Sequence, residues 1–215
     1  MRDLPLFPLD TVLFPHMPIH LHIFELRYQL MINKCIEEKH PFGVVLIRRG
    51  NEVGGEKVEP YPIGTTAVIT QVEKLAGGRM NIVAVGDDRF NVTELVYDEP
   101  YLTAKVECLP LQEPVTLDVA RRAHHLRPLV EKYLGQVALA NRDEVDVSQI
   151  PLPDDPLLLF YLSSTLLQLP ALEKQPLLAA ETAADMLAKL IRLYRRETAL
   201  MDQLYRRIPI RPEWN

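Results

Sequence analysis

The stretch of sequence that decides the fold is the opening one. It reads Leu4-Pro5-Leu6-Phe7-Pro8-Leu9, then Val12-Leu13-Phe14-Pro15, then Ile23-Phe24-Glu25-Leu26-Arg27-Tyr28. The prolines at positions 5, 8, 15 and 18 exclude a helix at the start, because proline has no backbone N–H, and they predict an extended segment at the edge of a sheet. The apolar residues at 24, 28, 31 and 35 follow one helical face, which predicts a helix from Phe24 to about Lys39 that ends before Pro41.

Short apolar segments separated by turn residues predict strands over the rest of the first half. They cover residues 42–47, 64–75, 81–86, 89–96 and 101–109. Gly77-Gly78 connects two of them, and short glycine turns favour antiparallel strands. Residues 48–63 are rich in glycine, proline and charge, which predicts a long surface loop. Five or six short antiparallel strands indicate a curled sheet or small barrel that hides its own edges.

The second half of the chain is predicted to be helical, with a domain boundary near residue 113. The apolar pattern over 117–139 is helical, although Pro128 should break or kink it. Asp155 followed by Pro156 predicts the start of a helix whose body, 157–169, is apolar nearly all round and belongs in the centre of a bundle. A short helix near 171–180 and a long helix from Thr182 to about Arg207 follow. We therefore expect an α+β fold with a β-rich subdomain at 1–112, which contains one helix, and a helical bundle at 113–215.

The composition is that of a folded globular protein of 215 residues, with 47% apolar and 25% charged residues. A net charge of −5 disfavours nucleic acid as a partner, because phosphates call for a concentrated positive field. Cys35 and Cys108 have no neighbouring ligand pattern and are expected to be free thiols in a reducing cytoplasm. No apolar run approaches the roughly 20 residues of a membrane span, and the start has no signal-peptide pattern. We therefore expect a cytoplasmic protein with no membrane contact.

Together these segments resemble the amino-terminal, substrate-binding domain of Lon-type ATP-dependent proteases. Besides the opening stretch, the resemblance rests on residues 42–47, Gly64-Thr65-Thr66-Ala67, Gly86 with Arg89-Phe90, Asp155-Pro156 and Leu172-Glu173-Lys174-Gln175. It covers nearly the whole chain. It implies a β-rich subdomain similar to the PUA-like barrels, a helical bundle after it, and a role in binding polypeptide.

The resemblance does not include the ATPase or the peptidase part of Lon proteases. The sequence contains no GxxxxGK[ST] phosphate loop, and we find no peptidase module. We therefore expect a stand-alone member of the family that is not an enzyme and needs no cofactor. Its expected partner is an unfolded polypeptide or a partner protein, and its expected state is a monomer or a weak homodimer.

The expected recognition surface is the proline-rich segment after the first strand, with the loop at 54–62. Its candidate residues are Phe14, Pro15, His16, Met17, Ile19 and Tyr61. Prolines hold such a segment rigid, and a partly covered apolar surface with an adaptable methionine suits weak binding of unfolded polypeptide. Two other interpretations stay open: Phe14 and Ile19 belong to the core, or the groove between barrel and bundle is the binding site.

Other residues that could carry chemistry are better explained as structural. His16, His20 and His22 lie close in sequence, but no carboxylate or cysteine follows at metal-ligand spacing, so we expect no metal. Ser163-Ser164-Thr165 has no nucleophile-elbow pattern, and hydroxyls on a helix commonly bond to carbonyls one turn back. Two alternative functions remain: an RNA-binding PUA-like protein, or a small-ligand-binding protein that uses the cleft between the subdomains.

Overall fold

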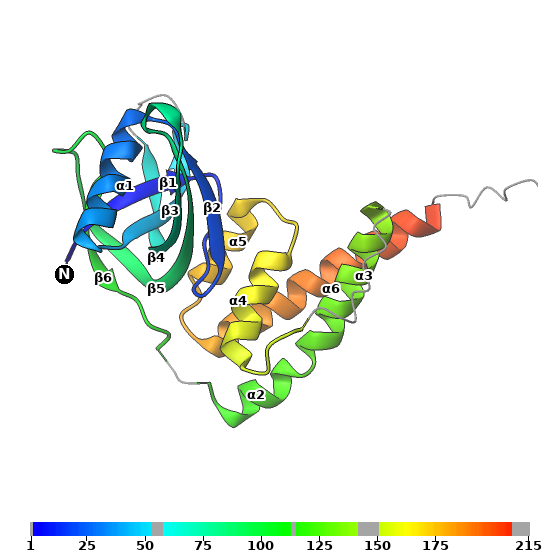
Figure 1. The fold of residues 1–215 in the computed structure, drawn as a ribbon. Coiled ribbons are helices and arrows are strands. Elements are labelled where there is room, and N and C mark those ends of the chain that lie inside the picture. The colour runs from blue at the N-terminus through cyan, green and yellow to red at the C-terminus, as the bar shows by residue number, and fades with distance from the viewer. Residues whose placement is uncertain (1, 53–57, 113–114, 142–150, 208–215) are drawn as a thin grey trace, which may run out of the picture. The chain divides into compact units, whose positions relative to one another are not determined.

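The computed structural model describes residues 2–52, 58–112, 115–141 and 151–207 (Figure 1). The chain forms two compact units. The first combines Met1–Gln112 with Ser164–Ala180, and the second combines Glu113–Ser163 with Glu181–Asn215. The sequence division at 112/113 and the contact-based division differ in one segment, because residues 164–180 lie with the first unit.

Six strands make up the sheet of the first unit. They are β1 (Arg2–Leu9), β2 (Pro18–Ile23), β3 (Phe42–Arg49), β4 (Glu59–Lys74), β5 (Met80–Val96) and β6 (Thr103–Cys108). The strand order is β2-β5-β4-β3-β1-β6, and β5 also pairs with β6. Five strands thus follow one another in a closed cycle of pairings, while β2 is attached to β5 outside that cycle. The predicted strands at 81–86 and 89–96 form one continuous strand, β5.

The sheet is mixed, which corrects the expectation of antiparallel strands alone. β1 and β3 run parallel, with Leu6 opposite Gly43 and Leu9 opposite Leu46. Between them the chain contains β2 and the helix α1 (Leu26–Glu38). A connection of that length allows the chain to return in the same direction, which a short glycine turn does not.

β1 does not lie at the edge of the sheet, contrary to the prediction from its prolines. Residues 2–5 pair with β6 and residues 6–9 pair with β3. Within these registers, each half of β1 therefore pairs with one neighbouring strand. Pro5 and Pro8 each lie in a different half, where one missing N–H interrupts fewer ladder bonds than in a strand paired on both sides throughout.

Helix α1 supplies much of the core of the first unit, and Figure 1 shows it lying against the strands. Tyr28, Met31 and Cys35 are buried as the 3–4 spacing predicted. The ring of Tyr28 stacks on Phe7 of β1, with 4.1 Å between the ring centres. Lys39 ends the helix in the left-handed conformation, where its N–H bonds to carbonyls of the last turn.

Helix α5 (Ala171–Leu178) is joined to the first unit by buried hydrogen bonds. The Arg89 side chain of β5 donates from Nη1 to the carbonyls of Leu178, at 2.6 Å, and Ala180, at 2.7 Å. Gln175 donates from Nε2 to the carbonyl of Ile63 on β4, at 2.8 Å. These bonds connect α5 to β4 and β5, in keeping with the grouping of residues 164–180 with the sheet.

The second unit consists of helices α2 (Leu117–Ala123), α3 (Leu126–Asn141) and α6 (Ala183–Arg207), with most of α4 (Pro156–Leu166). The break expected at Pro128 falls earlier, between α2 and α3. Pro128 instead occupies the first turn of α3, where a missing N–H costs no helical bond. Helix α4 begins as predicted, because the Asp155 carboxylate accepts a bond from the Leu158 N–H at 2.8 Å.

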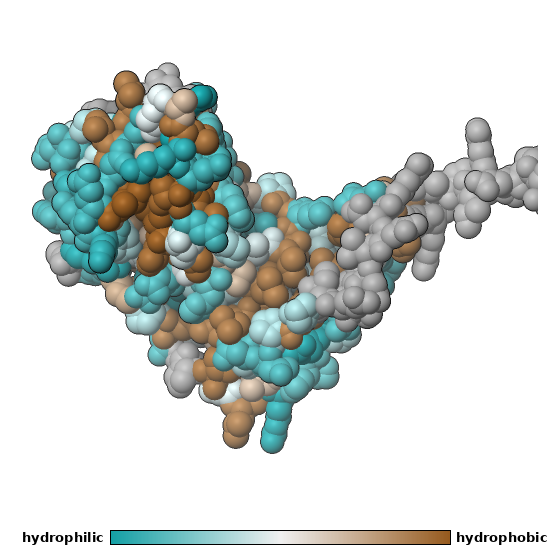
Figure 2. Space-filling model, in the orientation of Figure 1, coloured by the Kyte–Doolittle hydropathy of each residue, from teal (hydrophilic) through white to brown (hydrophobic). Residues whose placement is uncertain are grey.

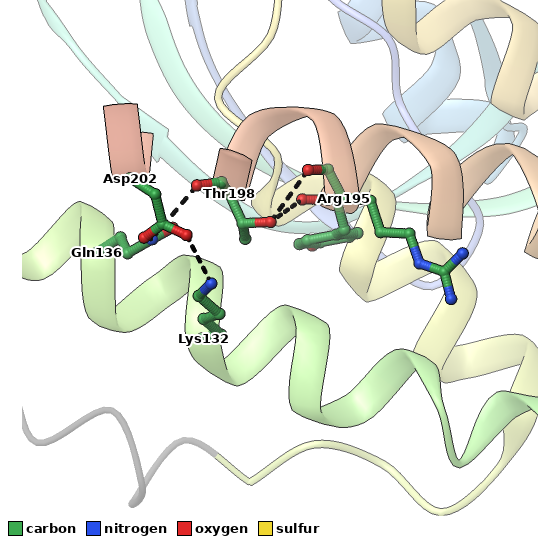
Figure 3. Close-up of polar contacts among 6 residues, drawn as sticks. Lys132, Gln136, Arg195, Thr198 and Asp202 are labelled. Carbon is green, nitrogen blue, oxygen red and sulfur yellow. Dashed lines mark hydrogen bonds and ion pairs between the residues drawn. The ribbon is translucent and has the colours of Figure 1, made fainter. Parts of the chain in front are cut away.

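Polar contacts fix α3 against α6 (Figure 3). Asp202 accepts one bond from Gln136 Nε2 at 2.6 Å and another from Lys132 Nζ at 2.8 Å. Thr198 donates back to the carbonyl of Tyr194 at 2.8 Å, as hydroxyls on helices commonly do. The Tyr194 hydroxyl donates to the Ser163 carbonyl of α4 at 2.8 Å. Nowhere in the described ranges does a helix combine the length and the apolar content that crossing a membrane requires.

Candidate recognition surface

The predicted segment around Phe14 forms a turn that is fastened to the sheet. The carbonyl of Leu13 accepts a bond from the Thr65 hydroxyl of β4 at 2.6 Å. The His16 N–H donates to the Gly86 carbonyl at 2.8 Å, and the Gly86 N–H donates to the Met17 carbonyl at 3.0 Å. Backbone and side-chain bonds to two strands therefore hold residues 13–17 in place.

Gly86 is required by this arrangement. A Cβ atom on Gly86 would lie 2.4 Å from the carbonyl oxygen of Phe14, closer than real Cβ contacts occur. Gly86, Arg89 and Phe90, on which the family resemblance rests in part, thus have structural roles. Phe90 is fully buried, and Arg89 holds the end of α5.

The turn divides the predicted site residues into buried and accessible ones. Phe14 is 1% exposed and Pro15 is buried, so these two side chains belong to the core. His16 is exposed, with a left-handed φ of 64°. Met17 and Ile19 are half-buried and pack partly on the core beneath β2. Of the predicted residues in this segment, His16, Met17 and Ile19 offer side-chain surface to a partner.

Tyr61 lies on a strand and not in a loop. Its neighbours Pro60 and Ile63 pair with β3 and β5, because β4 begins at Glu59. Residues 53–57 of the predicted loop lie outside the described residues. The half-buried Tyr61 side chain is therefore positioned by the β3–β4–β5 ladder, and the turn at 13–17 by Thr65 and Gly86.

Strand β2 is the end strand of the sheet, and within the described residues it pairs only with β5. Its residues alternate as a half-buried strand should: Pro18, His20 and His22 are exposed, while Ile19, Leu21 and Ile23 turn toward the core. An end strand presents backbone N–H and C=O groups on its outer side, which can pair with another extended chain.

Exposed apolar side chains gather where β2 passes into α1. Phe24 is 49% exposed, Leu26 76% and Leu30 57%. The ring of His22 stacks near Phe24, with 6.0 Å between ring centres, and Gln29 Nε2 donates to the Phe24 carbonyl at 2.9 Å. We call His20, His22, Phe24, Leu26 and Leu30 the β2–α1 surface. Because α1 begins at Leu26, Phe24 precedes the helix, which corrects its predicted place on the buried helical face.

Two hollows adjoin this surface. One, of about 280 Å³, is lined by Leu21, Phe24 and Tyr28 among others. The other, of about 510 Å³, is lined by His20, Val72 and Val83 among others. Figure 2 shows an apolar hollow on the first unit with hydrophilic side chains around it. Apolar hollows with a polar rim are typical of surfaces that take up other molecules.

A chain of polar contacts crosses three strands beside the second hollow. His22 Nδ1 lies 2.7 Å from Asn81 Oδ1, and Asn81 Nδ2 donates to Glu73 at 2.8 Å. The His22 side chain thus contacts both the Asn81 amide and the Phe24 ring. Over the stretches that the structure describes, no three His, Cys, Asp or Glu side chains gather closely enough to hold a metal ion.

Three side chains that could act as nucleophiles, Ser163, Ser164 and Cys35, are withdrawn from solvent, whereas the Cys108 thiol is exposed. Ser163 and Ser164 are fully buried in α4. Cys35 is buried in α1, and burial raises the pKa of its thiol to about 11. A thiol with that pKa stays protonated at neutral pH and is a poor nucleophile. The β2–α1 surface itself offers apolar and imidazole groups that suit contact more than reaction.

The sequence matches a known domain family over most of its length. The family model is that of the ATP-dependent protease La (LON) substrate-binding domain, and it matches residues 3–196. A Lon protease of Koribacter versatilis is 30% identical over 185 residues, which cover 85% of this chain and 22% of that protein. A LON peptidase N-terminal domain and RING finger protein of Schizosaccharomyces pombe is 33% identical over 115 residues, covering 48% of this chain and 24% of that protein. The chain spans a quarter or less of the length of these curated relatives.

Solved structures show the same fold. A Lon N-terminal domain protein from Xanthomonas campestris superposes with a TM-score of 0.63 at 24% identity, covering 89% of this chain and 98% of that one. The N-terminal domain of a Mycobacterium avium complex Lon protease gives 0.67 at 19% identity, covering 90% and 98%. With the family match over residues 3–196, this chain belongs to the Lon substrate-binding domain family.

Proposed function

We propose that this chain recognises polypeptide, without chemistry of its own, through the β2–α1 surface. The observation that carries the proposal is the match of residues 3–196 to a substrate-binding domain, in a chain that exposes Phe24, Leu26 and Leu30 beside an end strand. The cycle of strand pairings from β5 through β4, β3, β1 and β6 back to β5 supports a PUA-like barrel as the scaffold.

An unfolded polypeptide can supply partners both for the exposed apolar side chains of the β2–α1 surface and for the outer backbone groups of β2. Its apolar side chains can cover Phe24, Leu26 and Leu30, and each such side chain contributes about 1.5–3 kcal/mol when fully buried. Its extended backbone can pair with the outer side of β2, as in strand addition to a sheet edge. Ordering a flexible chain offsets much of this gain, so we expect dissociation constants of roughly 1–100 μM.

The test is a titration of the full chain with a permanently unfolded, alkylated model protein, followed by fluorescence anisotropy. Replacing three exposed residues, as Phe24→Ser, Leu26→Ser and Leu30→Ser together, should weaken binding more than about tenfold, because the apolar contact area is lost. The matched control is Leu172→Ser on α5, a leucine of the same unit that is 60% exposed. It should leave the affinity within about twofold. Absence of binding by the unmodified chain at about 100 μM, or equal weakening by the control, would contradict the proposal.

A further inference from the structure

The first unit contains a second pocket, of about 600 Å³, which the β2–α1 surface does not include. Helix α1 contributes Met31, Lys34, Cys35 and Glu38 to its wall. The start of β1 contributes Asp3, Leu4 and Pro5, and His40 follows α1. The end of β5, the connection after it and the start of β6 contribute the rest. A hollow of this size is in the range of sites that take up a small molecule or a side chain with its flanking backbone.

The rim of the pocket is strongly acidic. Five carboxylates line it, from Asp3, Glu38, Glu94, Asp98 and Glu99, against two lysines, Lys34 and Lys105. Lys105 pairs with Glu94 at 2.7 Å, and Lys34 lies 3.8 Å from Glu99. In the part of the chain that the structure describes, the three remaining carboxylates, Asp3, Glu38 and Asp98, form no ion pair within 4 Å. Besides Tyr101 and Glu99, Glu38 nevertheless helps to raise the pKa of Lys34, and besides Glu94, Asp3 helps to raise the pKa of Lys105. Five carboxylates thus still outnumber the two lysines. The field inside the pocket therefore favours a cation.

The floor of the pocket is apolar and aromatic. Leu4 and Met31 are fully buried, and Tyr101 is 7% exposed. Lysine and arginine side chains combine an apolar stem with a charged head, so their stems can cover such a floor while the head meets the carboxylates. An aromatic ring next to a cation adds a cation–π attraction. A purely apolar side chain would match the floor but not the acidic rim, and an anion would be repelled by the rim.

We infer that this pocket receives a lysine or arginine side chain of a bound polypeptide. The inference rests on the proposed function, because it names a class of polypeptide that the same unit would select: extended segments that carry a basic residue. The charge of the rim and the apolar floor together support this occupant.

The experiment uses the full chain and three fluorescent peptides of equal length and apolar content that differ at one central position: arginine, norleucine or glutamate. We expect the arginine peptide to bind at least about tenfold more tightly than the norleucine peptide, a difference of about 1.4 kcal/mol. The glutamate peptide should bind most weakly. Raising the salt concentration from 50 to 500 mM should reduce the advantage of arginine, because screening weakens exposed charge pairs.

Matched variants test whether the preference for arginine comes from the carboxylates of the pocket rim. Glu38→Gln combined with Asp98→Asn removes two rim carboxylates and should bring the arginine and norleucine peptides within about twofold of each other. Glu37→Gln is the control, because Glu37 is the exposed neighbour of Glu38 on α1 and does not line the pocket. It should preserve the preference for arginine. Thermal melting of each variant shows whether it is folded before binding is compared.

The outcomes separate this inference from the proposed function. If all three peptides bind equally, or if Glu37→Gln abolishes the preference as fully as the pocket variant, the inference is overturned while polypeptide recognition stands. If no peptide binds, both fail. If spermidine or Mg²⁺ alone raises the melting temperature as much as the arginine peptide, and does so only with an intact rim, the pocket is a site for small cations and the inference is likewise overturned.

Discussion

Gly86 shows how one residue sets the geometry of the turn before β2. The carbonyl of Phe14 passes so close that only a hydrogen atom fits on the Gly86 Cα. The same glycine exchanges backbone bonds with His16 and Met17. The position therefore couples the turn at 13–17 to β5, and through it the start of β2.

Gly86→Ala is expected to destabilise the chain by about 1–3 kcal/mol, because the added methyl forces the Phe14 backbone away. Gly135→Ala is the control, since Gly135 lies in α3 with no atom within 4 Å of its would-be Cβ. It should instead stabilise by about 0.5–1 kcal/mol, because glycine in a helix interior is unfavourable relative to alanine. The urea unfolding midpoint should therefore fall for Gly86→Ala and rise for Gly135→Ala. A neutral Gly86→Ala would show that the turn moves freely.

Cys35 and Cys108 are expected to differ in reactivity because one is buried and the other exposed. With iodoacetamide at pH 8, mass spectrometry should find Cys108 modified first, and Cys35 only as fast as the chain unfolds. Burial raises the pKa of Cys35 from 9.0 to about 11. The unfolded chain therefore loses that proton near pH 9 while the folded chain keeps it, and stability falls as the pH rises from 9 to 11. Cys35→Ala should lack this part of the decline, and equal labelling of both thiols would contradict the assignment.

At the scale of elements, Arg89 joins a strand to a helix that is distant in sequence. Its guanidinium is buried and donates two short bonds to the carboxyl end of α5. The last carbonyls of a helix have no partner within the helix, so a cation placed there satisfies them and interacts favourably with the helix dipole. Gln175 adds a bond from α5 to β4. Helix α5 is thus held by polar bonds at specific points.

Arg89→Leu should loosen α5 more than any other element. Hydrogen bonds to charged groups contribute about 1.5–3 kcal/mol, and the variant leaves buried carbonyls unsatisfied. Hydrogen exchange read by mass spectrometry should show faster exchange in residues 171–178. Arg79→Leu is the control, because Arg79 is exposed and its side chain donates to the nearby Ala76 carbonyl at 3.1 Å. Unchanged protection of α5 in Arg89→Leu would show that apolar packing alone holds the helix.

At the scale of the whole molecule, the first unit is discontinuous in sequence. It needs residues 164–180 in addition to the first 112. The chain therefore completes this unit only after most of the second unit has been synthesised. The two units are covalently interleaved, and neither is a simple contiguous segment.

A fragment of residues 1–112 is expected to be less stable than the first unit of the full chain. It lacks α5, so Arg89 and Ile63 lose their partners at Leu178, Ala180 and Gln175. Its thermal transition should be lower and broader than that of the full chain. A synthetic peptide of residues 164–180 should raise the midpoint in a concentration-dependent manner, as a specific ligand does. If the fragment melts at the same temperature and ignores the peptide, the segment is dispensable.

Local chemistry in the sequence was enough to predict most elements and the family. Apolar spacing placed α1 and α6, glycine and proline placed the turns, and Asp155 with Pro156 placed the start of α4, because these signals act within a few residues. The order of these segments along the chain was also enough to indicate the Lon-type domain, which the match over residues 3–196 confirmed.

Only the tertiary structure decided which distant residues meet. It made β1 and β3 parallel, buried Phe14 and Pro15, brought Arg89 to the end of α5, and gathered Asp3, Glu38 and Asp98 around one pocket. Pairing between strands and burial of a given side chain depend on contacts across many intervening residues. A local pattern fixes which face of an element is apolar, but it does not fix which element covers that face.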